Sequence, residues 1–256
     1  MPTLIETSTL DECAKLCTES GLDFIELNMN LPTFQLNRID ADYCRSVAEK
    51  YGIYYTIHLD ENLNVCDFNP YVAQAYIKTV AETIELAKSL NIKVLNMHLA
   101  KGVYFTLPDK KVLLFSEYKE QYFKSIVEFR CMCESAIGEA DIKICIENCD
   151  GYEDFQKEAI ELLLESGVFA LTFDVGHNHG IGGADEDFIM KHKDRLHHIH
   201  LHDALGRKNH LALGTGETDI GKYINLAKAQ NCRVVLETKT VEGLRQSVEW
   251  LKGNVR

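Results

Sequence analysis

Short β-branched or aromatic-rich runs alternate with longer amphipathic runs along the whole chain, and this alternation restricts the folds that it can adopt. Eight runs are predicted to be strands: 3–7, 24–29, 54–59, 93–99, 143–148, 170–175, 196–202 and 234–238. Between them lie helical patterns with apolar residues three and four apart, for example 71–90, 118–140 and 242–252. Strands that alternate with helices pair in parallel through right-handed crossovers. Eight such units predict a (β/α)₈ TIM barrel.

The length and composition fit one α/β barrel. The 256 residues match the roughly 250 that such a barrel needs, and 46% of them are hydrophobic. No linker, low-complexity segment or shift in composition marks a second domain, so residues 1–256 are predicted to form a single one. An open, doubly wound sheet is the alternative, but such a sheet rarely has eight regular units.

The charge of the chain bears on its partners. A formal net charge of −12 makes nucleic-acid binding unlikely, because a nucleic-acid surface needs a positive footprint. Anionic substrates stay open, since a bound metal inverts the local potential. The chain has no basic N-terminal region followed by an apolar run, and no apolar run of about 20 residues, so no membrane partner is expected.

The nine cysteines are scattered without the spacing of a metal finger. We interpret them as reduced, mostly buried thiols. Reduced thiols are typical of proteins in a reducing compartment, so a cytoplasmic protein is predicted.

Polar side chains of ligand type recur near the carboxyl ends of the predicted strands. They are Glu26, Asn28, His58, His98, Glu147, Asp174, His200 and Glu237. Parallel barrel strands deliver these ends to one face, where barrel active sites lie. A single buried histidine is most often a hydrogen-bonded core residue, whereas eight polar residues in phase predict a shared site at the mouth.

Four of these residues form a predicted metal-ligand set: Glu147, Asp174, His200 and Glu237. Three carboxylates and an imidazole suit a divalent cation such as Mn²⁺, Mg²⁺, Co²⁺ or Zn²⁺, and the oxygen content favours the harder ions. Glu147 and Glu237 come from the fifth and eighth predicted strands, so they are expected on opposite sides of the site.

Strand 196–202 carries four histidines. Alternation places His198, His200 and His202 on one face and His197 on the other. Only His200 belongs to the ligand set. We expect His198 and His202 to fill layers of the barrel interior or to orient a ligand.

Five further residues are candidates for substrate binding: Glu26, His58, His98, His177 and His210. His58 and His98 are expected beside the metal site, and His210 lies in a loop that can reach into the mouth. His177 lies three residues after Asp174 and has three possible roles. We rank contact with a substrate oxygen first, orientation of a metal ligand second, and binding of a further metal ion third.

Two glycine-bearing loops, 179–183 and 213–218, carry backbone N–H groups of the kind that bind phosphate. Neither matches a nucleotide-binding fingerprint: GxxxxGK[ST] is absent, and no GxGxxG follows the first strand. We therefore interpret them as ordinary glycine-rich barrel loops.

The strand ends resemble the xylose-isomerase-like barrel superfamily, which contains sugar phosphate isomerases and epimerases and the endonuclease IV group. The matching segments, in order, are IHLDENLN (57–64), LNMHLAKG (95–102), IEN (146–148), FDVGH (173–177), HIHLHD (198–203), HLALGTGETD (210–219) and LET (236–238). The resemblance covers nearly the whole chain. It implies that the four-residue set holds the metal and that Glu147 and Glu237 flank the substrate and exchange protons with it.

This resemblance implies a metal-dependent isomerase or epimerase acting on a small-molecule sugar or sugar phosphate. The cation would polarise a carbonyl and stabilise charge as an enediolate forms, with Glu147 and Glu237 as catalytic proton-transfer groups. Epimerisation needs proton-transfer groups on both faces of the substrate, whereas aldose–ketose isomerisation can use a single group on one face. The sequence leaves both reactions open. The native metal, the substrate and a homo-oligomeric state also stay open.

The alternative is a metal-dependent phosphoester hydrolase that resembles endonuclease IV and holds several zinc ions. Its additional ligands would be His58, His98, His177 and His210, all present, but Lys208 stands where the remaining Asp belongs. A lysine repels a nearby cation unless it is deprotonated. A third hypothesis is a non-catalytic barrel that binds a sugar. It is disfavoured because each buried carboxylate without a function would lower the stability of the fold by several kcal/mol.

Overall fold

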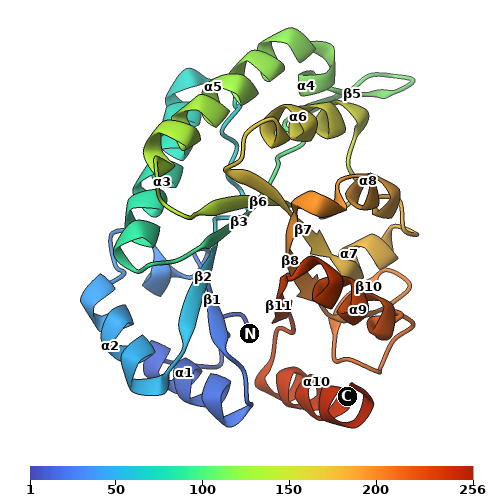
Figure 1. Ribbon diagram of the computed structural model, residues 1–256. Coiled ribbons are helices and arrows are strands. Elements are labelled where there is room, and N and C mark those ends of the chain that lie inside the picture. Colours follow the sequence, from blue (N-terminus) through green and yellow to red (C-terminus); the bar gives the residue numbers. More distant parts are fainter. Residues whose placement is uncertain (256) are drawn as a thin grey trace.

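The structure is a computed structural model that describes residues 1–255, and it confirms a parallel barrel surrounded by helices (Figure 1). Within these residues one sheet has seven parallel strands in the order β1-β2-β3-β6-β7-β8-β11. Their bounds are β1 Phe24–Asn28, β2 Tyr54–His58, β3 Val94–His98, β6 Lys143–Glu147, β7 Phe169–Asp174, β8 Leu196–Leu201 and β11 Arg233–Leu236. The last seven predicted strands each match one of these within two residues at either end.

Helices follow the strands along the chain and cover the outside of the barrel (Figure 1). They are α1 Leu10–Glu19, α2 Ala41–Tyr51, α3 Pro70–Ser89, α4 Leu114–Glu117, α5 Lys119–Ile137, α6 Asp154–Leu164, α7 Val175–Gly180, α8 Glu186–Lys191, α9 Ile220–Gln230 and α10 Val241–Asn254, with 3₁₀ turns η1 Pro32–Phe34 and η2 Lys193–Arg195. Side chains fix where many of them begin. Thr9, Asp40 and Asn69 accept N–H groups of the first turns of α1, α2 and α3.

The first predicted strand, 3–7, is wrong. Residues 1–3 join the edge of β1 through a single parallel bridge between Pro2 and Glu26, and Thr3 N–H donates to the carbonyl of Glu26 at 2.9 Å. The chain then turns, and the Ile5 side chain is 85% exposed. The run 3–7 therefore does not form a buried strand. A short bridge lies beside β1 where an eighth strand was expected.

Two antiparallel hairpins were not predicted from the sequence. The first pairs β4 Tyr104–Thr106 with β5 Lys111–Leu113, after β3. The second pairs β9 Asp203–Leu205 with β10 Lys208–Leu211, after β8, and its register shifts between Lys208 and Leu211. Because both follow barrel strands, they lie at the carboxyl ends, where sites are built.

A layer of buried polar side chains lies inside the barrel. Glu26 on β1 accepts hydrogen bonds from Thr56 Oγ1 at 3.0 Å and from His198 Nε2 at 2.9 Å. Asn96 on β3 donates to the carboxylate of Glu147. All five side chains belong to residues that are at most 1% exposed. We call Glu26, Thr56, Asn96 and His198 the polar floor, because they lie beneath Glu147 and the other side chains of the mouth.

Within residues 1–255, no helix has both the length and the hydropathy that a membrane crossing requires.

Candidate metal centre

The structure brings the four predicted ligand residues together at the mouth of the barrel. Glu147 ends β6, Asp174 ends β7, His200 lies in β8 and Glu237 follows β11 directly. His200 Nδ1 lies 3.1 Å from a Glu147 oxygen, 3.2 Å from a Glu237 oxygen and 3.9 Å from an Asp174 oxygen. One donor atom from each residue lies within 4.8 Å of the others.

The chemistry of this cluster fits a divalent cation. Burial would raise the pKa of both Glu147 and Glu237, but the charge of His200 outweighs burial and holds these pKa values well below their ordinary range. Burial would likewise lower the pKa of His200, whereas the surrounding carboxylates raise it well above its usual value. One Glu237 oxygen is buried without a hydrogen-bond partner. Three buried carboxylates around one imidazole thus form the donor set of a hard or borderline cation.

His58 and His98 lie on one side of the centre. Their Nε2 atoms are 3.3 Å and 3.2 Å from the same oxygen of Glu147, and their rings meet edge to face with centroids 5.0 Å apart. Burial would lower the pKa of His58, but Glu147 outweighs it and raises that pKa to about 9. His58 and His98, which were predicted to bind substrate, therefore both contact one oxygen of Glu147, a predicted metal ligand.

His177 and His210 lie on the other side. Their ring centroids are 5.1 Å apart, and His177 Nδ1 is 3.5 Å from an Asp174 oxygen. His210 Nδ1 lies 3.1 Å from the carbonyl oxygen of Glu237, and burial lowers the pKa of His210 to about 4. Lys208, on the same hairpin, is exposed.

Glu26 lies below the centre, in the polar floor. It is 1% exposed, and one of its oxygens is 2.8 Å from His200 Nε2, an ion pair rather than an aligned hydrogen bond. Its other oxygen accepts the proton of His198 Nε2. His200 therefore separates Glu26 from the mouth.

Sequence reasoning missed two residues that touch the carboxylates. Lys239 Nζ lies 2.8 Å from Glu237 Oε1, and Asn96 donates to Glu147. Each is two positions from a predicted site residue, Glu237 or His98. The alternation of an extended chain was thus a signal that could have found both.

The loop 213–218 is organised by Asp203 rather than left open for an anion. The two oxygens of Asp203 accept backbone N–H groups from Ala204, Gly214, Gly216 and Thr218 at 2.8–3.0 Å. A carboxylate of the chain thus occupies the N–H groups that a phosphate would need, in agreement with the interpretation of this loop as structural.

Replacing Asp203 with Asn should lower the free energy of unfolding by about 1–3 kcal/mol, because an amide has only one accepting oxygen for four donors. Burial raises the pKa of Asp203, but the backbone N–H groups outweigh burial and leave it below its ordinary value. The stabilisation is therefore present above the unfolded pKa of about 4 and is lost as the pH falls through the lower folded value. Urea unfolding at pH 7 and pH 3 should show a smaller difference between parent and variant at pH 3. An equal difference at both pH values would contradict this.

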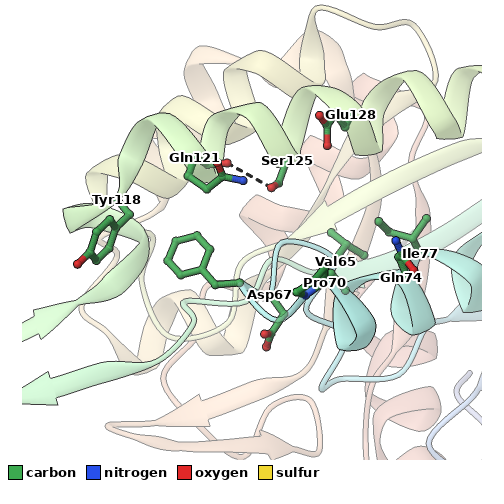
Figure 2. A pocket seen from close by; sticks show the side chains of 11 residues that line it. Val65, Asp67, Pro70, Gln74, Ile77, Tyr118, Gln121, Ser125 and Glu128 are labelled. Carbon is green, nitrogen blue, oxygen red and sulfur yellow. Dashed lines mark hydrogen bonds between the residues drawn. The ribbon is translucent and has the colours of Figure 1, made fainter.

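A groove of about 470 Å³ lies outside the barrel, between the start of α3 and α5 (Figure 2). Figure 2 shows Asp67, Gln74, Tyr118 and Glu128 along it. None of its lining residues belongs to the cluster at the mouth. The groove lies on the outer helices and is therefore separate from the residues predicted to bind metal and substrate.

The fold and the cluster define a TIM barrel with a candidate metal centre at the carboxyl ends of its strands. A model of the xylose isomerase-like TIM barrel family matches residues 14–254, and the chain belongs to this family. The uncharacterized protein MJ1188 of Methanocaldococcus jannaschii is 28% identical over 213 residues, which are 80% of this chain and 73% of that protein.

Solved structures share the fold at low sequence identity. A D-tagatose 3-epimerase-like protein is 20% identical with a TM-score of 0.78, covering 96% of this chain and 93% of that one. The 3-keto-D-glucoside 4-epimerase YcjR of E. coli is 15% identical with a TM-score of 0.80, covering 99% and 98%. The IOLI protein with a bound zinc atom is 16% identical with a TM-score of 0.74, covering 98% and 94%.

Proposed function

We propose that this protein is a metal-dependent isomerase or epimerase that acts on a sugar or a sugar phosphate by proton transfer through an enediolate. The observation that carries the proposal is that Glu147 and Glu237, three strands apart in the barrel, both approach His200 Nδ1, at 3.1 Å and 3.2 Å. Two carboxylates that reach one point from different strands are suited to remove and return a proton at a carbon next to a carbonyl. The epimerases named among the solved structures of this fold support the same class.

The proposed metal is Mn²⁺, Mg²⁺, Co²⁺ or Zn²⁺, held by Glu147, Asp174, His200 and Glu237. When bound, such an ion polarises a carbonyl as a Lewis acid. The zinc atom named for the IOLI protein supports a divalent ion in this fold.

The two glutamates are proposed to act as bases at neutral pH. Asn96 donates to Glu147 and Lys239 pairs with Glu237, while His200 contacts both, so each carboxylate is held in its ionised form. An ionised Glu147 or Glu237 accepts a proton from one face of the substrate carbon. The glutamate that has taken this proton can return it to the same face. A proton reaches the opposite face only from the other glutamate, after that carboxylate has taken up a proton from solvent.

The rim histidines are proposed to bind substrate hydroxyl groups. His58 and His98 line one side and His177 and His210 the other, so a chain of hydroxyl groups between them meets donors at both ends. His210, with a pKa of about 4, is neutral at pH 7, and its Nδ1–H donates to the carbonyl oxygen of Glu237, so its Nε2 is left to accept a hydrogen bond from a substrate hydroxyl. Glu26 is proposed to affect the substrate only through His200, because the floor buries it.

Deuterium exchange tests this function. The protein, loaded with Mn²⁺, is incubated in D₂O with a panel of ketoses and ketose phosphates that includes D-tagatose, and products are followed by NMR. We expect deuterium at a carbon next to the carbonyl, together with an epimer or an aldose. The same sample with a chelator is the control. No deuterium in any ketose of the panel, with metal bound, would refute the proposal.

The second candidate is a multi-zinc phosphoester hydrolase, favoured by one observation. His58 and His98 both face Oε2 of Glu147, whereas His200 Nδ1 meets Oε1, and this supports a second cation beside Oε2. Two or three zinc ions per chain and cleavage of bis(4-nitrophenyl) phosphate would support the hydrolase. One ion per chain without that cleavage supports the isomerase or epimerase.

A further inference from the structure

We propose that His202 is a positioning residue: with its proton on Nε2, it holds Asp174 in the centre and anchors the backbone of the loop that carries His210. The purpose of this arrangement rests on the proposed function, whereas the arrangement itself is a property of the metal-free protein. His202 lies one residue past β8 and is fully buried.

The hydrogen bonds of His202 fix its protonation. Its Nδ1 lies 2.8 Å from the backbone N–H of His210, which can only donate, and 3.4 Å from the carbonyl oxygen of Asp203, which can only accept. The shorter contact assigns a lone pair and no proton to this nitrogen. The proton of the neutral ring must then be on Nε2. That nitrogen lies 3.1 Å and 3.0 Å from the two oxygens of Asp174, so the ring donates to the carboxylate. A donor that orients a ligating carboxylate is a recurrent support of metal sites.

The backbone that His202 anchors is strained. His210 has φ of +55°, in the left-handed region that side chains with a Cβ rarely adopt. It lies where the register of β9 and β10 shifts, between Lys208 and Leu211. Because of this register shift, the backbone N–H of His210 donates to His202 rather than to the neighbouring strand of the hairpin. The His210 side chain then lies toward Glu237.

The protein makes room for the ring at Gly176. A Cβ added at this position, two residues after Asp174, would lie 2.0 Å from Cε1 and 2.1 Å from Nδ1 of His202. The ring cannot turn away freely, because both of its nitrogens are hydrogen-bonded. Gly176 therefore admits the imidazole that supports the neighbouring ligand.

His202 also lies in a group that has the composition of a metal site. Donor atoms of His177, His202 and His210 are within 4.8 Å of one another. As a ligand of a second ion, however, His202 would have to give up either His210 N–H or Asp174. The two roles therefore predict different results on substitution.

Two amide substitutions separate the two hydrogen bonds. His202→Asn retains an acceptor near the position of Nδ1 and loses the donor to Asp174. His202→Gln retains a donor near the position of Nε2 and loses the acceptor for His210 N–H. Zn²⁺ affinity is measured by competition with a chromophoric chelator, and exchange of the His210 amide is measured by NMR in the metal-free protein.

We expect the Asn variant to bind Zn²⁺ about 10–100-fold more weakly, with His210 amide exchange within about threefold of the parent. The Gln variant should keep its Zn²⁺ affinity within about threefold, while its His210 amide exchanges at least about tenfold faster, as expected for a lost protecting hydrogen bond. Unchanged values for both readouts in both variants would overturn the proposal. So would a parent that binds two zinc ions per chain and loses one in both variants.

A measurement on the unsubstituted protein keeps the proposal testable if the variants fail to fold. Long-range ¹H–¹⁵N NMR of the metal-free chain should show a protonated Nε2 and an unprotonated Nδ1 at His202. A proton on Nδ1 would overturn the proposal. A parent that takes up no metal would refute the proposed function, whereas the NMR and amide-exchange results would still decide the role of His202.

Discussion

Replacing Glu237 with Gln should lower the turnover of a ketose substrate by about 10³-fold or more. The substitution keeps the shape of the side chain but removes a proton-transfer group, whose contribution is typically about 10²–10⁴-fold, and it weakens one metal ligand. Lys239 also loses its charged partner. The rate should be measured by NMR at saturating Mn²⁺, so that weaker metal binding does not account for the loss.

A matched control is Glu249→Gln, which makes the same chemical change on the exposed face of α10, where Glu249 pairs with Lys252. We expect parental turnover from that variant. Circular dichroism should show that both variants are folded. Turnover of the Glu237→Gln variant within about tenfold of the parent would contradict a catalytic role for Glu237.

Removing the metal should produce the second large effect, a marked loss of thermal stability. Without a cation, the carboxylates of Glu147, Asp174 and Glu237 crowd around one imidazole. Restoring Mn²⁺ or Zn²⁺ to about 100 times its dissociation constant should stabilise the folded state by about 2.7 kcal/mol. Calorimetry of chelator-treated and reloaded protein measures this shift.

The stabilisation by metal should decrease toward acidic pH, because protons compete with the cation for the carboxylates and for His200. The control is Asp174→Asn, which removes one ligand charge and should reduce the shift. Elemental analysis of the reloaded protein should give one ion per chain. The absence of any thermal shift with all four candidate cations would exclude the metal centre.

The sequence predicted the fold because strands buried on both sides leave short continuous apolar runs, which stand out between amphipathic helices of three- and four-residue period. It failed at 3–7, where a β-branched run suggests a strand although Ile5 stays in solvent. Whether such a run pairs depends on the edge that it meets, which is a tertiary property. The hairpin β4–β5 was missed for a related reason: β4 is exposed along its length, so no burial pattern marks it.

The predicted ligand residues lie together because strand ends in a closed barrel share one face. For His202 the sequence left two roles open, filling the barrel interior or orienting a ligand, and the choice between them was not readable in the same way. It depends on which ring nitrogen meets Asp174, 28 residues earlier, and which meets the backbone of His210. Nor does the sequence reveal that Asp203 accepts three N–H groups from the glycine-bearing loop 213–218. Atomic distances, rather than residue types, decide such contacts.

The polar floor has a consequence for how this protein can diversify. Glu147 and His200 are held from beneath by Asn96 and Glu26, which are strand residues. The hairpin β4–β5 follows β3 at the same end of the barrel, and none of its residues takes part in these contacts. Exchanging the β4–β5 hairpin should therefore alter which molecules enter while the acids beneath keep their positions. Substitutions that adapt the protein to a new substrate are therefore best tolerated in the β4–β5 hairpin.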